Sequence, residues 1–365
     1  MKTNKILLSV ALAALAIIVA TPTVKAQNDA TGIEKPLIGT LRLEARADFQ
    51  YTDHTYALND STWGSSPYGF RGKYFNLHMG GHIGDKFSYY FRQRIRANAG
   101  DVRFFDNTDF LYLNYQANPN WGLRFGKDAL AVGGFEYDLP PIDVMFFGYY
   151  WDNYYCFQNA ASVAFTTNDG NHTFRAQVAM SPYCYTGSPY GETNMLSYNI
   201  LWSGNMGHWQ TLWSVSLFDG GNRFMQNIVL GNKLEYERFN IYLDLIYRNT
   251  GSMDLACYSA IAEAQYKLCG TWTLFAKGSY VNNQQHDGSD CLSQPGQKEI
   301  YGGMGCYFRP IPSVRLHAFA AYYNNTWATS VNSGMGNDNR TARDLGCNIG
   351  VTWNIDALKI LQQHK

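Results

Sequence analysis

Three arginines stand at every second position of one short segment: Arg92, Arg94 and Arg96. In an extended strand, side chains two residues apart project to the same side, about 6.7 Å from one another. A row of guanidinium groups that lines a water-filled passage favours anions or phosphates. The alternative is structural: each arginine pairs with a carboxylate of a neighbouring strand or loop and stiffens the wall.

Further basic residues occupy alternate positions in other segments. Acidic residues on the same faces are fewer: Glu44, Asp48, Glu235, Asp244 and Glu263. A low-dielectric wall with one sign of charge focuses the field and enriches ions of the opposite sign. We therefore predict a net positive inner face whose candidate pore-lining and anion-binding residues are Arg42, Arg46, Arg92, Arg94, Arg96, Arg124, Lys127 and Arg175.

The residues between these charges show which elements must carry them. In residues 41–51 every odd position is apolar or aromatic and every even position is polar, and this pattern recurs along the chain. A period of two places the apolar residues on one face of a strand. The segments are about 10 residues long with aromatics at their ends, as in transmembrane barrels, whereas soluble strands are mostly about 5–6 residues.

The connections between these segments alternate in length. Short turns of Gly, Asn, Asp and Pro chemistry, such as 84–86 and 168–171, alternate with long segments such as 282–298. This is the layout of an outer-membrane barrel, whose short turns are periplasmic. We expect sixteen strands, the first over 38–51 and the last over 344–355. The predicted fold is all-β: a transmembrane, antiparallel, up-and-down barrel wide enough for an aqueous lumen.

Composition and the first residues fit an exported membrane protein. Only 16% of the 365 residues are charged, against about 25% in soluble domains. Because 29 basic residues balance 29 acidic ones, a bulk basic surface for nucleic acid is excluded. Residues 1–26 have a basic start, an apolar middle and a V-K-A end, which predicts a signal peptide. We expect residues 27–365 to form one barrel domain in the outer membrane of a Gram-negative bacterium, against lipid and lipopolysaccharide.

The connection 131–155 is the longest in the chain and is rich in aromatic residues. Loops of this length are usually functional or disordered, and the aromatic content favours packing. We predict that this third extracellular loop folds into the barrel as a constriction loop, with Glu136, Asp138 and Asp143 facing arginines of the lumen. The alternative is an external cap.

Enzyme and metal signatures are absent from the sequence. It contains no G-x-S-x-G, P-loop, H-E-x-x-H or C-x-x-C motif, so we predict no catalytic residue, no cofactor and no metal site. Two alternatives to a channel stay open: a secreted soluble all-β binding protein, and a barrel-type lipid hydrolase. Partition into the outer membrane with heat-modifiable migration separates a channel from a soluble protein.

Three stretches carry a resemblance to a known family: residues 72–77 (GKYFNL), 84–94 (GDKFSYYFRQR) and 126–138. Together they resemble the phosphate-selective porin O/P family. The resemblance implies a sixteen-stranded, usually homotrimeric outer-membrane porin with an inward third loop, and it matches Arg92, Arg94 and Arg96 to the family's arginine ladder. The family's lysine cluster is reduced to Lys127, so we expect a porin for small anions in general, with phosphate as one candidate. A surface lipoprotein is a further partner that the long loops could receive.

Overall fold

The computed structural model describes residues 36–58, 61–95, 107–152, 155–185, 195–220, 224–249, 257–283, 297–328 and 339–363. The predicted signal peptide, residues 1–26, lies outside these ranges. Within the described residues, no helix is long and apolar enough to cross a membrane.

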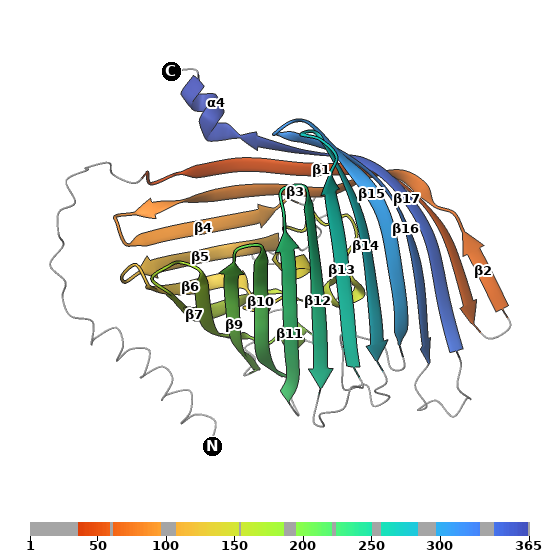
Figure 1. Cartoon of the computed structure of the whole chain (residues 1–365), viewed down its shortest axis with the longest axis horizontal. Coiled ribbons are helices and arrows are strands. Elements are labelled where there is room, and N and C mark those ends of the chain that lie inside the picture. Colours follow the sequence, from red (N-terminus) through yellow and green to blue (C-terminus); the bar gives the residue numbers. More distant parts are fainter. Residues whose placement is uncertain are drawn as a thin grey trace. The chain divides into compact units, whose positions relative to one another are not determined.

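In the described part of the chain, seventeen strands form one antiparallel sheet, and Figure 1 follows them by colour along the chain. The first half comprises β1 (Thr40–Leu58), β2 (Ser61–Ser65), β3 (Tyr68–Ile83), β4 (Phe87–Arg94), β5 (Thr108–Gln116), β6 (Trp121–Ala129), β7 (Phe157–Thr166), β8 (His172–Met180) and β9 (Leu196–Met206). The second half comprises β10 (Trp209–Asp219), β11 (Phe224–Glu235), β12 (Phe239–Asn249), β13 (Cys257–Lys267), β14 (Trp272–Asn283), β15 (Lys298–Ile311), β16 (Val314–Ala328) and β17 (Asn339–Asp356). Four short helices are described: α2 (Phe135–Asp138), α3 (Tyr149–Asp152), η2 (Pro182–Tyr185) and α4 (Ala357–Gln363).

The sheet closes on itself. Each long strand pairs with the next along the chain, and β1 pairs both with β3 and with β17, from Arg42 opposite Asp356 to Leu58 opposite Arg340. The five-residue β2 only extends the end of β1, so sixteen of the seventeen strands build the wall. This confirms the predicted sixteen-stranded antiparallel barrel. The first strand is longer than expected, because β1 continues past residue 51 to Leu58 against β2 and β17.

The alternation along each strand produces two chemically opposite faces. One face exposes large apolar side chains, for example Phe70, Phe125 and Ile349, which are 89%, 73% and 67% exposed. The other face buries polar and charged side chains, such as Arg46 and Asp48 on β1. An exposed apolar belt around a closed sheet is the surface that lipid requires, and it leaves the polar face to line the interior.

Candidate functional site

The segment 130–152 lies against the polar face of the sheet. At its start, the backbone N–H of Gly133 donates to Ser214 Oγ on β10 at 2.8 Å. The N–H groups of Phe135 and Glu136, at the first turn of α2, donate to the carboxylate of Asp244 on β12 at 2.8 and 2.9 Å. These bonds satisfy N–H groups that a helix start leaves without an internal partner.

The backbone of Gly133 lies too close to the backbone of β10 to leave room for a side chain. A Cβ on Gly133 would lie 2.2 Å from the carbonyl oxygen of Leu212, which is nearer than any real Cβ contact. Gly134 has φ of 103°, a conformation that side chains with a Cβ rarely adopt. The Gly133-Gly134 pair therefore lets the segment run directly on β10.

Glu136 and Lys277 form an ion pair inside the barrel. Lys277 Nζ on β14 lies 2.8 Å from Glu136 Oε2, and both side chains are almost fully buried. The other carboxylate oxygen accepts the backbone N–H of Gly148 at 2.6 Å, and Lys277 also donates to the carbonyl of Phe146 at 2.5 Å. Burial raises the pKa of Glu136, and the charge of Lys277 opposes that rise. One buried pair thus holds both ends of the turn between α2 and α3.

The far end of the segment is held by arginines from opposite ends of the chain. Arg46 on β1 donates to the carbonyl of Val144 at 2.9 Å, and Arg315 on β16 binds Asp143 Oδ1 at 2.6 Å. Arg315 also donates to the carbonyl of Ile142 at 3.2 Å. The segment 130–152 is therefore tied to β10, β12, β14, β16 and β1.

Apolar packing supports the same course. Tyr150 and Trp151 belong to a buried cluster with Phe218, Val229 and Ile246, which are side chains of β10, β11 and β12. A second cluster joins Met145 and Phe146 to side chains of β14, β15 and β16. The aromatic residues that distinguish this connection in the sequence are those that pack against the barrel wall.

The predicted arginine ladder is neutralised in part. Arg92 and Arg94 share one carboxylate: Asp109 Oδ2 lies 2.8 Å from Arg92 Nη2 and 2.9 Å from Arg94 Nε. The Arg92 guanidinium also lies over the ring of Phe110, 4.5 Å from its centroid. Arg96 lies outside the described residues.

A β-bulge brings Asp109 into this cluster. The pairing of β4 with β5 shifts between Arg92 and Gln93, whose partners are Phe110 and Thr108, so Asp109 has no residue opposite it. Bulges re-aim side chains in this way. Strict alternation puts Asp109 on the same face as Leu111, so this contact cannot be predicted from the alternation.

The other predicted anion-binding residues have different surroundings. Arg42 lies 3.7 Å from Glu44, and Arg46 binds Asp48 at 2.8 Å. Arg124 binds Asp128 at 2.9 Å and lies over the ring of Tyr112. Asp128 has the same parity as Arg124, so the alternation could have identified it.

Lys127 does not lie with the other cations, which corrects the prediction. Its partners across the sheet are Leu111 and Asn159, and both are exposed positions of the outer face. Side chains of directly paired residues project to the same side of a sheet. Lys127 is therefore on the opposite face to Arg124.

Arg175 on β8 has no side-chain hydrogen bond or ion pair among the described residues. It lines a cavity of about 160 Å³ together with Arg124, Asn114 and Ser162. Its charge interacts at longer range with Asp138, the remaining predicted acid of the segment 130–152. Burial raises the pKa of Asp138 above its ordinary value, although Arg175 and Lys233 oppose that rise.

The charge balance of the interior differs from the prediction. The strand residues alone predict a surplus of inner cations, but Asp109, Asp128, Glu136 and Asp143 offset it through the pairs above. Glu136 faces a lysine, whereas an arginine was expected. Among the described residues predicted to bind anions, the cations in excess of their carboxylate partners are Arg175 and the pair Arg92 and Arg94, which share Asp109.

A closed sixteen-stranded sheet with an apolar outer belt and a polar inner face defines the class: an outer-membrane β-barrel of the porin type. Residues 40–197 match the family model described as "Phosphate-selective porin O and P". That match, which runs from β1 to the start of β9, confirms the resemblance found in the sequence. A search of curated proteins returns no match.

Solved structures share the fold at low sequence identity. An anion-selective porin from Comamonas acidovorans is 14% identical, with a TM-score of 0.56 over 86% of this chain and 98% of that chain. The outer-membrane channel DcaP of Acinetobacter baumannii is 11% identical, with a TM-score of 0.55 over 86% and 96%. OmpT of Vibrio cholerae is 10% identical, with a TM-score of 0.53 over 86% and 97%.

Proposed function

We propose that this porin forms a water-filled channel for passive diffusion of small solutes with a preference for anions. The observation that carries the preference is Arg175, an inward cation without a carboxylate partner among the described residues, beside Arg124 in a polar cavity. Paired arginines contribute little net field, whereas an unpaired one in a low-dielectric wall attracts counter-ions strongly. The similar porin from Comamonas acidovorans is anion-selective, which supports the same direction.

Small anions in general fit this interior better than phosphate alone. The two described arginines of the ladder already share the carboxylate of Asp109, and the lysine near the start of the segment 130–152 faces outward. A site dedicated to phosphate needs several donors free of protein acceptors. In the proposed channel the segment 130–152 narrows the lumen, because the residues that hold it lie on five different strands of the wall.

The cellular setting follows from the same class. We propose that residues 1–26 are a signal peptide and that residues 27–365 form one barrel domain. The apolar belt contacts lipid, and the outer loops contact lipopolysaccharide and, as a further candidate, a surface lipoprotein. A homotrimer is supported by the trimer form of one similar structure, in-vitro folded OmpT of Vibrio cholerae.

The test is the reversal potential of the purified protein in planar bilayers under a salt gradient. The unaltered channel should be anion-selective, and Arg175→Gln should shift the reversal potential toward cations. Lys127→Gln removes one charge from the outer face and serves as the matched control, with no expected shift. A cation-selective or non-conducting unaltered protein would overturn the proposal.

A further inference from the structure

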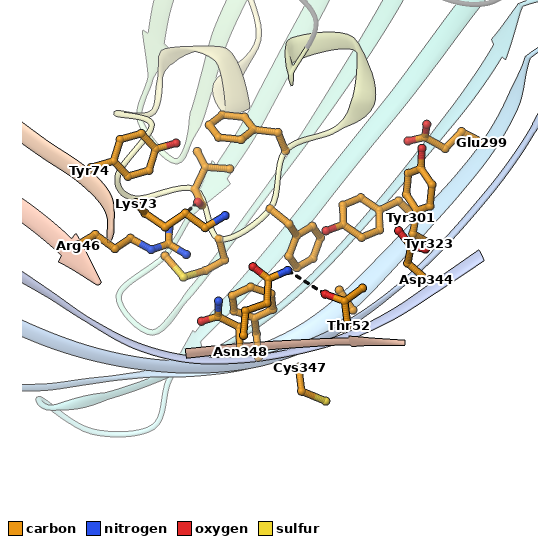
Figure 2. A pocket seen from close by; sticks show the side chains of 18 residues that line it. Arg46, Thr52, Lys73, Tyr74, Glu299, Tyr301, Tyr323, Asp344, Cys347 and Asn348 are labelled. Atoms are coloured by element: carbon orange, nitrogen blue, oxygen red, sulfur yellow. Dashed lines mark hydrogen bonds between the residues drawn. The ribbon is translucent and has the colours of Figure 1, made fainter. Parts of the chain in front are cut away.

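A cavity of about 510 Å³ lies between the segment 130–152 and the wall formed by β1, β3 and β15 to β17. Its size is that of a small-molecule site. Figure 2 shows Arg46, Lys73 and Tyr74 on one side of it and Glu299, Tyr301 and Tyr323 on the other. It is separate from the Arg124–Arg175 cavity, with which it shares no lining residue.

Aromatic rings form one wall of this cavity. The ring centroid of Phe146 lies 4.5 Å from that of Tyr301 and 5.7 Å from that of Phe319. Tyr323 extends the row, with its ring 5.7 Å from Tyr301. Rings from the loop and from two strands thus line one wall, and such faces suit the C–H faces of a ligand ring as well as cations.

A buried acceptor of the same cavity lacks a hydrogen-bond donor. Asn348 is 4% exposed, and its Nδ2 donates to the Asp48 carboxylate at 3.0 Å, which fixes the orientation of the amide. Its Oδ1 is buried and has no hydrogen-bond partner among the described residues. A buried acceptor in this state is costly, and a donor group on a ligand would remove the cost.

The charges around the cavity argue against both an anion and a cation as its ligand. Glu299 and Asp344 present carboxylates, which repel anions, while Lys73 and Arg46 repel cations. Asp344 is also bonded to His54, and Arg46 to Asp48. A lining that mixes donors and acceptors in this balance complements hydroxyl groups, which both donate and accept.

We propose that this cavity binds a neutral, polyhydroxylated ring solute of the sugar class. The ligand ring stacks on the Phe146–Tyr301 wall, and one hydroxyl donates to Asn348 Oδ1. This site goes beyond the anion preference proposed above, because its chemistry excludes the ions that the Arg175 region favours. The same barrel would then offer two solute classes different positions along its interior.

Binding is measured by calorimetry on the purified barrel in detergent, with glucose, glucosamine and glucose 6-phosphate as matched neutral, cationic and anionic probes. Glucose should bind most tightly, and Tyr301→Ala should weaken its binding at least tenfold. Tyr280→Ala, which removes a tyrosine paired across the sheet with the exposed Ile300, is the control and should leave binding unchanged. Heat-modifiable migration checks folding, and Tyr323→Leu replaces Tyr301→Ala if that variant does not fold.

Three results would overturn the inference: no binding of glucose, tighter binding of either charged probe, or glucose binding unaffected by both tyrosine replacements. The assay does not depend on ion selectivity. A barrel that binds glucose but is cation-selective contradicts only the proposed anion preference. A barrel that is anion-selective but does not bind glucose contradicts only the sugar site.

Discussion

Lys277 Nζ on β14 lies 2.8 Å from Glu136 Oε2, and these two residues join the wall of the barrel to the segment 130–152. Removing one partner of a buried pair leaves an uncompensated charge and typically costs about 3–5 kcal/mol. We expect Lys277→Met to release the loop and to raise single-channel conductance. Lys277→Met combined with Glu136→Gln should be less disruptive than Lys277→Met alone. An unchanged conductance in the single variant would show that the pair does not hold the loop in place.

Asp109 controls the charge of the arginine pair. Asp109→Asn leaves Arg92 and Arg94 without their shared carboxylate, so we expect a stronger anion preference in the reversal potential. Arg92→Gln together with Arg94→Gln should shift it toward cations, because Asp109 then carries an unopposed charge. Equal reversal potentials in all three proteins would assign the cluster a purely structural role.

Acidification should strengthen the anion preference through Asp138. Burial raises the pKa of this carboxyl, so on lowering the pH it takes up a proton earlier than an ordinary aspartate. Protonation removes a negative charge near Arg175 and Lys233. Because the pKa in the folded state is the higher one, the same protonation favours the folded barrel as the pH falls.

The measurement is the reversal potential between about pH 7 and pH 4, the range that includes the ordinary titration of carboxyl groups. The Asp138→Asn channel should be more anion-selective than the unaltered channel at neutral pH. As the pH is lowered, its reversal potential should lack the change that the unaltered channel shows before ordinary carboxyl groups titrate. If the unaltered channel and the variant respond identically to pH, another carboxyl group is responsible.

Gly133 should tolerate no side chain. Gly133→Ala places a methyl group against the Leu212 carbonyl, and overpacking of this kind costs about 1–3 kcal/mol. We expect faster cleavage of the segment 130–152 by protease in the folded barrel. Gly270→Ala is the matched control, since a Cβ there meets no atom within 4 Å. Equal cleavage rates in the two variants would contradict a close approach at Gly133.

The barrel was predictable because lipid outside and water inside impose a period of two on every strand. That pattern identified sixteen strands and placed Arg46, Arg92, Arg124 and Arg175 on the polar face. It could not identify their partners, because pairing depends on register. Glu136 meets a lysine far along the chain, and no local pattern links the two.

The sequence predictions are incomplete where a bulge interrupts the period of two, and they are wrong where a residue is chosen against that period. A bulge between β4 and β5 turns Asp109 toward Arg92. Another shifts the pairing of β1 with β3 between Arg46 and Ala47, and Lys73 at this bulge lines the cavity of about 510 Å³. Lys127 was selected for its charge and its position near the loop, although its parity places it outside. Bulges depend on pairing between strands and leave no periodic mark in the sequence.

The contacts of Ile142, Asp143 and Val144 with Arg46 and Arg315 constrain the order in which the barrel and the segment 130–152 can assemble. Arg46 is on the first strand, Arg315 is on the last but one, and the wall between them is complete only when β17 has paired with β1. The half of the segment near Gly133 needs only β10 and β12, which are close to it along the chain. We therefore expect the part of the segment near Gly133 to dock before the barrel closes, and the part near Asp143 to dock only after β17 has paired with β1.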